Sequence, residues 1–275
     1  LVNQEKYIDN EWYYFQQDGS AVQGSWYTFP GVKTCYYDAD GHMVHGIYTI
    51  NGITYGFNEW TGALLTGEHY FTDGRSDQWY YFYEQDDNSG HKKGQMATGW
   101  TTHHGNRYYY NEKGEMLHGI GVIDGKSYGF NEWTGVQILG EHHFYDTDPF
   151  DWYYFDPQTG VMATGWTNYN NHTYYFESDG KMCHGEKYMN GLWYYFDEWT
   201  GVMATGWTDH HGNHYFYNSD GSMVHGEMYL SGYWYYFDEW TGVMATGWTN
   251  HSGNTYYYDG NGRMVHGKYT IGGVE

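Results

Sequence analysis

A repeat with a period of 41 residues constrains the fold of this chain more than any other feature. Glycines followed by Trp recur at that spacing, at Gly165, Gly206 and Gly247. Glycines preceded by His recur at the same spacing, at Gly185, Gly226 and Gly267. Each period therefore holds two alternating units of about 20 residues, and a period of this size is typical of repeat architectures.

Each unit has the pattern of a β-hairpin. One type reads GWTDHHGNHYFYNSDGSMVH from Gly206 to His225, and the other reads GEMYLSGYWYYFDEWTGVMAT from Gly226 to Thr246. In both types a turn containing Gly leads to a run of aromatic residues, a polar turn ending in Gly, and a Met. The chain has 35 Tyr and 40 Gly but 3 Pro, a composition that suits many short strands and not helices. Because aromatic strands bounded by glycine turns are typical of hairpins, we predict an all-β fold.

The hairpins are expected to form one β-solenoid. The unit boundaries can be followed along the whole chain, near residues 4, 24, 46, 67, 99, 119, 140, 165, 185, 206, 226, 247 and 267. They predict a single array over residues 1–275, made of about twelve consecutive β-hairpins of roughly 20 residues that alternate two repeat types. Since the chain begins and ends within a unit, we expect it to be a fragment of a longer protein.

Two units carry extra residues before the aromatic quartet, in EHYFTDGRSDQWYYF and EHHFYDTDPFDWYYF. Insertions in arrays of this kind lie in loops. Acidic residues of the second insertion, Asp146, Asp148 and Asp151, could coordinate calcium through their oxygens. No loop has the spacing of an EF-hand, so solvated loops are the simpler interpretation.

All 14 tryptophans fall into three positions of the repeat. Five follow the closing glycine: Trp26, Trp100, Trp166, Trp207 and Trp248. Five open a WYYF quartet: Trp12, Trp79, Trp152, Trp193 and Trp234. Four lie in an Asp/Asn-Glu-Trp-Thr-Gly turn: Trp60, Trp133, Trp199 and Trp240. Each position is therefore expected to form a row along the array.

These rows can be explained by packing or by binding. Alternate residues of a strand face opposite sides, so one face of each quartet is expected in the core while the other face remains aromatic. For any single Trp, core packing explains the residue as well as ligand binding does. The four turn tryptophans are harder to place in a core, because hairpin turns are normally exposed. They predict either lateral packing on the next unit or a stacking platform for sugar rings.

The acidic composition argues against polyanionic partners. There are 34 Asp and Glu against 12 Lys and Arg, which gives a net charge of −22. This charge repels DNA and anionic membranes. The sequence also has no run of about 18 apolar residues, the length that a helix needs to span a bilayer. We therefore expect neither nucleic-acid binding nor membrane insertion. Cys35 and Cys183 lie several units apart and are expected to be packed apolar residues and not a disulfide.

The repeated motif resembles the cell-wall-binding repeats of Gram-positive surface proteins. The motif is Gly-Trp, then Gly, three tyrosines or other aromatics, Gly, Met and Gly, seen from Gly165 to Gly185, with WYYFDEWTGVMATGW between copies. That family includes choline-binding modules of autolysins, glucan-binding repeats of glucansucrases and receptor-binding repeats of large clostridial toxins. The resemblance covers essentially the whole chain. It implies a β-solenoid on an extracellular protein, with ligand sites between successive hairpins.

The choline-binding branch of the family implies particular site residues. There, aromatic residues of neighbouring hairpins and a Met surround a quaternary ammonium group, which the rings attract. Carried over, this implies sites built from Trp166, Tyr174, Met182, Trp193, Trp207, Tyr215, Met223, Trp234, Tyr236 and Trp248. In this chain, however, alternate units end in His-Gly followed by Glu, Lys or Ile, so half of the implied cages lack a wall. The departure favours a neutral or zwitterionic glycan, bound at sites that recur about every 41 residues.

The predicted function is a non-catalytic binding module of the bacterial cell surface or cell wall. It would attach a secreted protein to a carbohydrate polymer, such as teichoic acid, a wall polysaccharide or an α-glucan, with choline-bearing polymers included. Repeated weak sites gain by avidity on a repeated polymer. The alternative is a structural adhesin stalk or a filament segment, because uncapped repeat ends permit end-to-end self-association.

No catalytic site, metal site or cofactor is predicted. The acid pairs Asp197-Glu198 and Asp238-Glu239 recur once per period in turns, whereas a glycosidase needs one cleft with two unlike environments. A row of histidines lacks the spacing of a zinc site: His45, His118, His184, His225 and His266. The 17 histidines predict that affinity or self-association changes on acidification through about pH 6.

Overall fold

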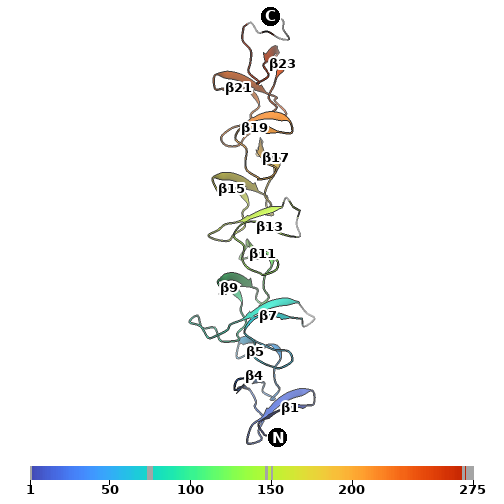
Figure 1. The fold of residues 1–275 in the computed structure, drawn as a ribbon, viewed down its shortest axis with the longest axis vertical. Coiled ribbons are helices and arrows are strands. Elements are labelled where there is room, and N and C mark those ends of the chain that lie inside the picture. The colour runs from blue at the N-terminus through green and yellow to red at the C-terminus, as the bar shows by residue number, and fades with distance from the viewer. Residues whose placement is uncertain (1, 73–76, 146–147, 150, 268–269, 271–275) are drawn as a thin grey trace. The chain divides into compact units, whose positions relative to one another are not determined.

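The computed structural model describes residues 2–72, 77–145, 148–149, 151–267 and 270. Over these residues it contains 24 β-strands, which pair into twelve antiparallel hairpins, and it contains no helix. The predicted all-β fold of about twelve hairpins is therefore confirmed. The chain divides into two compact units, Leu1–Ile138 and Leu139–Glu275, each with six hairpins. Figure 1 shows that the hairpins of each unit follow one another in chain order. The described part of the chain has no helix that could cross a membrane.

The first unit holds strands β1 to β12, paired in chain order. They are β1 (Gln4–Ile8) with β2 (Glu11–Phe15), β3 (Ser25–Phe29) with β4 (Lys33–Tyr37), β5 (Gly46–Ile50) with β6 (Ile53–Phe57), β7 (Gly67–Phe71) with β8 (Gln78–Phe82), β9 (Gly99–His103) with β10 (Asn106–Tyr110), and β11 (Gly119–Ile123) with β12 (Lys126–Phe130).

The second unit holds strands β13 to β24 in the same arrangement. They are β13 (Gly140–His143) with β14 (Trp152–Phe155), β15 (Gly165–Tyr169) with β16 (His172–Phe176), β17 (Gly185–Met189) with β18 (Leu192–Phe196), β19 (Gly206–His210) with β20 (Asn213–Tyr217), β21 (Gly226–Leu230) with β22 (Tyr233–Phe237), and β23 (Gly247–His251) with β24 (Asn254–Tyr258).

Two-residue turns close nine of the twelve hairpins, and both turn residues have positive φ. In the β17–β18 turn these residues are Asn190, with φ 51°, and Gly191, with φ 88°. Positive φ at both positions defines the type I′ turn, which Gly, Asn and Asp adopt most readily. The β3–β4, β7–β8 and β13–β14 connections are longer. The last two contain the insertions before the quartets, where Asp146 lies outside the described residues and Asp151 pairs with Lys181 at 2.7 Å.

The Met that ends most units links its unit to the preceding hairpin. The backbone N–H of Met223 donates to the carbonyl oxygen of Trp193 at 2.8 Å, and the N–H of Met182 donates to that of Trp152 at 2.7 Å. The Met side chain lies beneath the glycine of the next polar turn, so that a Cβ built on Gly242 would lie 2.3 Å from Met223 Sδ. The Met and the glycine thus fix the contact between neighbouring hairpins.

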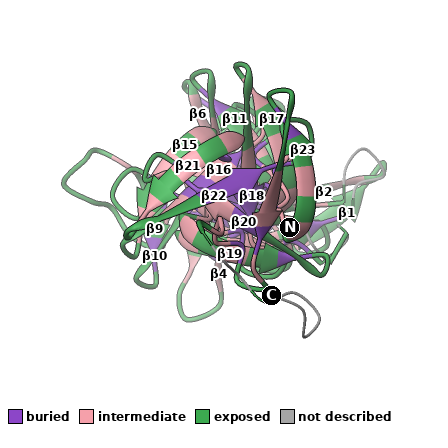
Figure 2. Cartoon of the chain, turned by 90° about the horizontal axis from the view of Figure 1, so that it is seen from above, coloured by how far each residue is buried: buried purple, intermediate pink, exposed green. Residues whose placement is uncertain are grey.

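The core of each unit is a row of aromatic rings. The last residue of nearly every second strand is fully buried, namely Tyr37, Phe57, Phe82, Tyr110, Phe130, Phe155, Phe176, Phe196, Tyr217, Phe237 and Tyr258. Figure 2 shows the buried residues within the hairpins and the exposed ones at their turns. Both cysteines, Cys35 and Cys183, are buried and free. Each small hairpin thus contributes rings that neighbouring hairpins cover, since a single two-stranded hairpin is marginal in water.

Candidate ligand-binding pockets

Three pockets with matching lining residues lie beside tryptophans that open WYYF quartets. The first is lined by Glu68, Trp79, Asn106, Tyr108, Met116, Trp133, Thr134 and Val136. The second is lined by Glu141, Trp152, Asn170, His172, Tyr174, Met182, Trp199, Thr200 and Val202. The third is lined by Glu186, Trp193, Asn213, Tyr215, Met223, Trp240, Thr241 and Val243. We call them the quartet pockets; each draws on three consecutive hairpins.

The third quartet pocket illustrates their construction. Trp193 is 37% exposed and Trp240 is 87% exposed, whereas Tyr215 and Met223 are buried. The two indoles therefore form the accessible walls, and the tyrosine and the methionine form the floor. Aromatic faces accept a sugar ring or a cation, and the Glu186 carboxylate adds a hydrogen-bond acceptor with negative charge.

The turn that carries Trp240 is held by its own aspartate. Asp238 Oδ1 accepts the backbone N–H of Trp240 at 3.0 Å, and also the N–H and hydroxyl of Thr241 at 2.8 and 2.9 Å. The hydrogen bonds from Thr241 and then Trp240 lower the pKa of the Asp238 carboxyl group. His225 Nδ1 lies 3.2 Å from the Asp238 carbonyl oxygen and therefore donates to it. Three other histidines of that row make the same contact at 3.2 to 3.3 Å: His45, His118 and His184.

The floor tyrosine is fixed by a stack of rings. His210 lies between Tyr195 and Tyr215, with ring centroids 4.0 and 3.9 Å away and planes within 7°. Its Nε2 lies 2.9 Å from the hydroxyl oxygen of Tyr217. Burial lowers the pKa of His210, and burial lowers the pKa of the equivalent His103 to about 4. Both imidazoles are therefore neutral near pH 7 and act as packing groups.

A pocket of a second kind lies beside a Trp that follows a closing glycine. It is lined by Trp207, Asp209, His214, Tyr235, Met244, Gly260, Asn261 and Arg263. The Trp207 ring packs edge-on against Phe216 and Tyr235, with centroids 5.2 and 5.0 Å away. We call this the junction pocket. Asp209 Oδ1 lies 2.5 Å from His214 Nδ1, so part of its polar lining is already paired.

The two kinds of pocket use opposite faces of one hairpin. Across β19 and β20, Trp207 pairs with Phe216, and Thr208 pairs with Tyr215. Neighbouring residues of a strand face opposite sides, so Tyr215 faces away from Trp207. The set implied by the family resemblance, Trp207 with Tyr215 and Met223, is therefore divided: Tyr215 and Met223 line the third quartet pocket, and Trp207 lines the junction pocket.

The equivalent set around Trp166 is divided in the same way. Tyr174 and Met182 line the second quartet pocket. Trp166 instead packs edge-on against Tyr175 and Tyr194, with centroids 5.2 and 5.1 Å away. The pairing of strands, which the sequence pattern alone did not specify, decides which aromatic residues meet.

The remaining residues of the implied sites lie in three different surroundings. Trp234 is 41% exposed, and its carbonyl oxygen accepts the N–H of Met264 at 2.7 Å. Tyr236 is buried and stacks on His251 at 3.9 Å. Trp248 is 67% exposed and contacts the ring of Tyr257 at 5.0 Å. Of these residues, Tyr236 is a core residue.

The turn tryptophans are among the most exposed rings in the described part of the chain. Their exposed fractions are 86% for Trp60, 73% for Trp133, 78% for Trp199 and 87% for Trp240. Three of them line the quartet pockets. An indole so exposed gains little from burial, so its position at a pocket rim favours a contact surface for a ligand.

The glutamates of the quartet pockets were not among the site residues predicted from the sequence. Glu68, Glu141 and Glu186 each follow a closing glycine, at the position where the other repeat type has Trp. The position that the family resemblance treats as a missing wall therefore holds a carboxylate that lines a pocket. The recurrence of Glu there, with Glu227 as a fourth copy, was the available signal.

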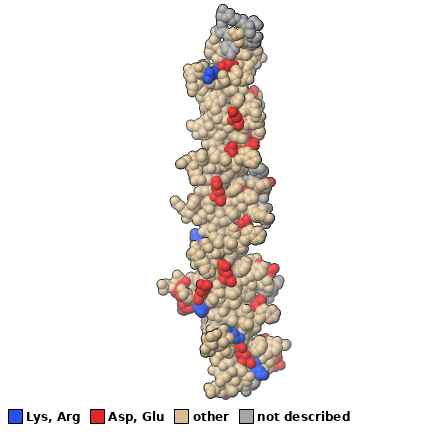
Figure 3. Space-filling view, viewed as in Figure 1, with Lys and Arg blue, Asp and Glu red and all other residues tan. Residues whose placement is uncertain are grey.

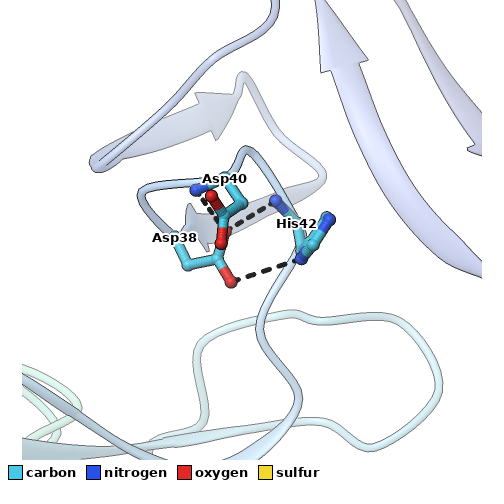
Figure 4. A group of neighbouring side chains, drawn as sticks. All are labelled: Asp38, Asp40 and His42. Carbon is cyan, nitrogen blue, oxygen red and sulfur yellow. Dashed lines mark hydrogen bonds and ion pairs between the residues drawn. The ribbon is translucent and has the colours of Figure 1, made fainter.

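Within the described residues, Asp38, Asp40 and His42 form a group with ligand atoms within 4.8 Å of one another (Figure 4). Asp38 Oδ1 accepts the backbone N–H of Asp40 at 3.0 Å and of His42 at 2.9 Å. Asp87 makes the same contacts with the two corresponding residues of its own turn. The group therefore has the hydrogen bonding of an ordinary Asx turn of this repeat.

Two family models match this chain. The choline-binding repeat matches residues 2–45, 163–206 and 204–246. The putative cell wall binding repeat matches residues 98–116 and 246–264. Glucosyltransferase-S of Streptococcus mutans serotype c is 29% identical over 198 residues, which cover 62% of this chain and 12% of that protein. Glucosyltransferase-S of Streptococcus downei is 29% identical over 223 residues, covering 62% and 16%. The chain thus spans less than a fifth of these relatives.

Solved structures of similar proteins share this architecture. CbpJ from Streptococcus pneumoniae superposes with a TM-score of 0.68 and 25% identity, over 90% of this chain and 97% of that one. Choline binding protein F from the same organism superposes with a TM-score of 0.64 and 26% identity, over 87% and 92%. Motif, hairpin fold and relatives agree, and the chain belongs to the family of choline-binding and cell-wall-binding repeats.

Proposed function

We propose that this chain is a non-catalytic binding module that attaches a secreted bacterial protein to a cell-surface carbohydrate polymer, such as teichoic acid, a wall polysaccharide or an α-glucan. The observation that carries the proposal is the repetition of one pocket, with Glu, Trp, Tyr, Met and Trp, at three places. A polymer presents one chemical group at regular intervals, so weak repeated sites engage it together and gain by avidity.

The similar proteins support a location on the cell wall. One solved structure is of choline binding protein F in the presence of a peptidoglycan analogue, with a TM-score of 0.53 and 25% identity. The glucosyltransferases are far longer than the matched segment. In those proteins the matched segment leaves room for a catalytic domain elsewhere in the chain. A segment of this kind therefore needs no catalytic group of its own, and a binding role suits a module that holds another domain at the cell surface.

We also infer that the six hairpins of each unit stack as a β-solenoid. Support comes from backbone hydrogen bonds that join Met residues to the preceding hairpin, such as Met223 to Trp193 and Met264 to Trp234. The row of buried rings at the ends of the second strands supports the same arrangement.

Retention on purified Gram-positive cell walls tests the binding role. The wild-type chain should sediment with the walls, and the double variant Trp193→Ala with Trp240→Ala should be retained less, because it removes both exposed walls of the third quartet pocket. Tyr229→Ala is the matched control, since it removes an exposed ring that lies outside the quartet pockets.

Competition identifies the polymer. Release of the bound chain by free choline would assign a choline-bearing wall polymer, and release by dextran would assign an α-glucan. Absence of retention on walls and on immobilised dextran, together with filaments seen by light scattering, would reject the binding role in favour of a structural stalk.

A further inference from the structure

In the first unit, residues at the positions that line a quartet pocket contact the chain's own Lys33, and we call this place the filled pocket. Lys33 Nζ lies 2.7 Å from Glu5 Oε1 and donates to the carbonyl oxygen of Thr61 at 2.8 Å. The Lys33 side chain is 15% exposed. An ammonium group held by a carboxylate and a carbonyl at these distances makes two charge-assisted hydrogen bonds.

Both hydrogen-bond partners of Lys33 have counterparts in the quartet pockets. Glu5 pairs with Tyr14 across β1 and β2, as Glu186 pairs with Tyr195 across β17 and β18. The Met and the turn residues repeat as well, because the N–H of Met43 donates to the carbonyl of Trp12 as that of Met223 donates to Trp193. Thr61 occupies the turn position of the pocket-lining Thr134 and Thr241: each follows a turn Trp.

Two substitutions in β4 distinguish this place from the others. Lys33 and Cys35 stand at the first and third positions of the strand, where the third pocket has Asn213 and Tyr215. A small Cys in place of the Tyr leaves room for the lysine side chain. Burial raises the pKa of the Cys35 thiol to about 11, and the positive charge of Lys33 opposes part of that rise.

We propose that the three quartet pockets bind a primary ammonium group carried by the wall polymer, at the place that the Lys33 ammonium occupies in the first unit. The acceptors are the pocket glutamate, Glu68, Glu141 or Glu186, and the carbonyl oxygen of the turn threonine. This inference rests on the proposed binding role and names the chemical class of its ligand.

The hydrogen-bond acceptors set the preference between amines. Aromatic walls attract any organic cation. A quaternary ammonium has no N–H and donates to neither the glutamate nor the carbonyl, whereas a primary ammonium supplies three donors. The free energy of one hydrogen bond to a charged group is large enough to make the primary amine bind roughly tenfold more tightly than the quaternary amine.

Calorimetric titration of the whole chain with ethanolamine and with choline tests this preference, because the two probes differ by three N-methyl groups. Ethanolamine should bind more tightly, and Glu186→Gln should remove one site for it. Glu198→Gln is the control, since it deletes the same charge from the turn of the same repeat, where Glu198 pairs with His211 at 3.0 Å. Choline binding as tightly as ethanolamine, or Glu186→Gln without effect, would overturn the inference.

The double variant Lys33→Asn with Cys35→Tyr tests the filled pocket. It restores the residues of the third quartet pocket and should add one ethanolamine site. An unchanged number of sites in a variant with the wild-type aromatic circular dichroism would contradict the inference. If that variant does not fold, the Glu186→Gln comparison still decides. Wall retention that ethanolamine does not compete for would reject the amine while leaving the binding role intact.

Discussion

One aromatic position of the repeat holds Phe, Tyr or His in different units, and the residue type decides whether the position can be protonated. In the five hairpins whose first strand holds a Trp, that strand ends in Phe29, His103, Tyr169, His210 or His251, and all five residues pack against neighbouring tyrosine rings. Tyr169 shows what a tyrosine does there: it stacks between Tyr154 and Tyr174, and its hydroxyl donates to Glu141 at 2.7 Å. A histidine keeps the stacking but adds a group that can be protonated.

The buried histidines should make the fold sensitive to acid. The folded-state pKa of His103 is about 4, below its ordinary value of 6.5, and that of His210 is also lowered, in both cases chiefly by burial. The unfolded chain therefore binds protons first, so this stability is complete above pH 6.5 and is lost as the pH falls toward 4. The double variant His103→Tyr with His210→Tyr should lose less stability in that window.

Thermal unfolding at several pH values measures this effect. The variant should show a smaller fall in melting temperature on acidification than the wild-type chain. The exposed His172→Asn is the control and should behave as the wild type does. An equal fall in all three proteins would assign the acid sensitivity to other groups.

The hairpin is the element that the sequence predicts best. Glycine and asparagine at turn positions predict type I′ turns, and the aromatic runs between the turns predict strands. The twelve hairpins therefore follow from the local sequence pattern. The composition of each pocket does not follow in the same way. Whether Tyr215 meets Trp207 depends on which residues pair across β19 and β20, and a shift by one residue exchanges the two faces.

The contact between Met223 and Gly242 gives a test of how hairpins are joined. Alanine at Gly242 would place its Cβ 2.3 Å from Met223 Sδ, at a φ of 67° that side chains disfavour. Gly247 has a similar φ of 71° and nothing within 4 Å of the added Cβ. Gly247→Ala should therefore cost about 1 kcal/mol of unfolding free energy, from backbone strain alone. Gly242→Ala should cost about 3 kcal/mol, because overpacking adds to the same strain.

Denaturant unfolding followed by near-ultraviolet circular dichroism compares the two variants. The aromatic signal reports the ring packing that the Met contact maintains. Equal costs for the two glycines would show that the conformation alone matters and that the Met contact does not join the hairpins.

Over the whole molecule, charge is dispersed and the pockets are repeated. Acidic side chains are scattered along the face seen in Figure 3, where basic ones are few. Four of the chain's 12 basic residues, Lys33, Arg107, Lys187 and Arg263, lie over aromatic rings of the same chain. The sequence predicted repeated sites with a 41-residue period, and the second and third quartet pockets have it, from Trp152 to Trp193. The sequence pattern could not predict which copy of the quartet pocket is filled, because that depends on the position of the Lys33 side chain.

Avidity predicts how the loss of turn tryptophans should accumulate. On a polymer, each pocket that is lost removes one intramolecular binding step, so the losses multiply. Trp240→Ala should weaken retention on cell walls a few-fold, and the triple variant with Trp133→Ala and Trp199→Ala should weaken it roughly a hundredfold. Trp60→Ala should leave retention unchanged, because Lys33 fills the pocket beside that turn through its bond to Thr61. If Trp60→Ala weakens retention as much as Trp240→Ala does, the turn tryptophans contact the polymer independently of the pockets, and the filled first pocket has no bearing on binding.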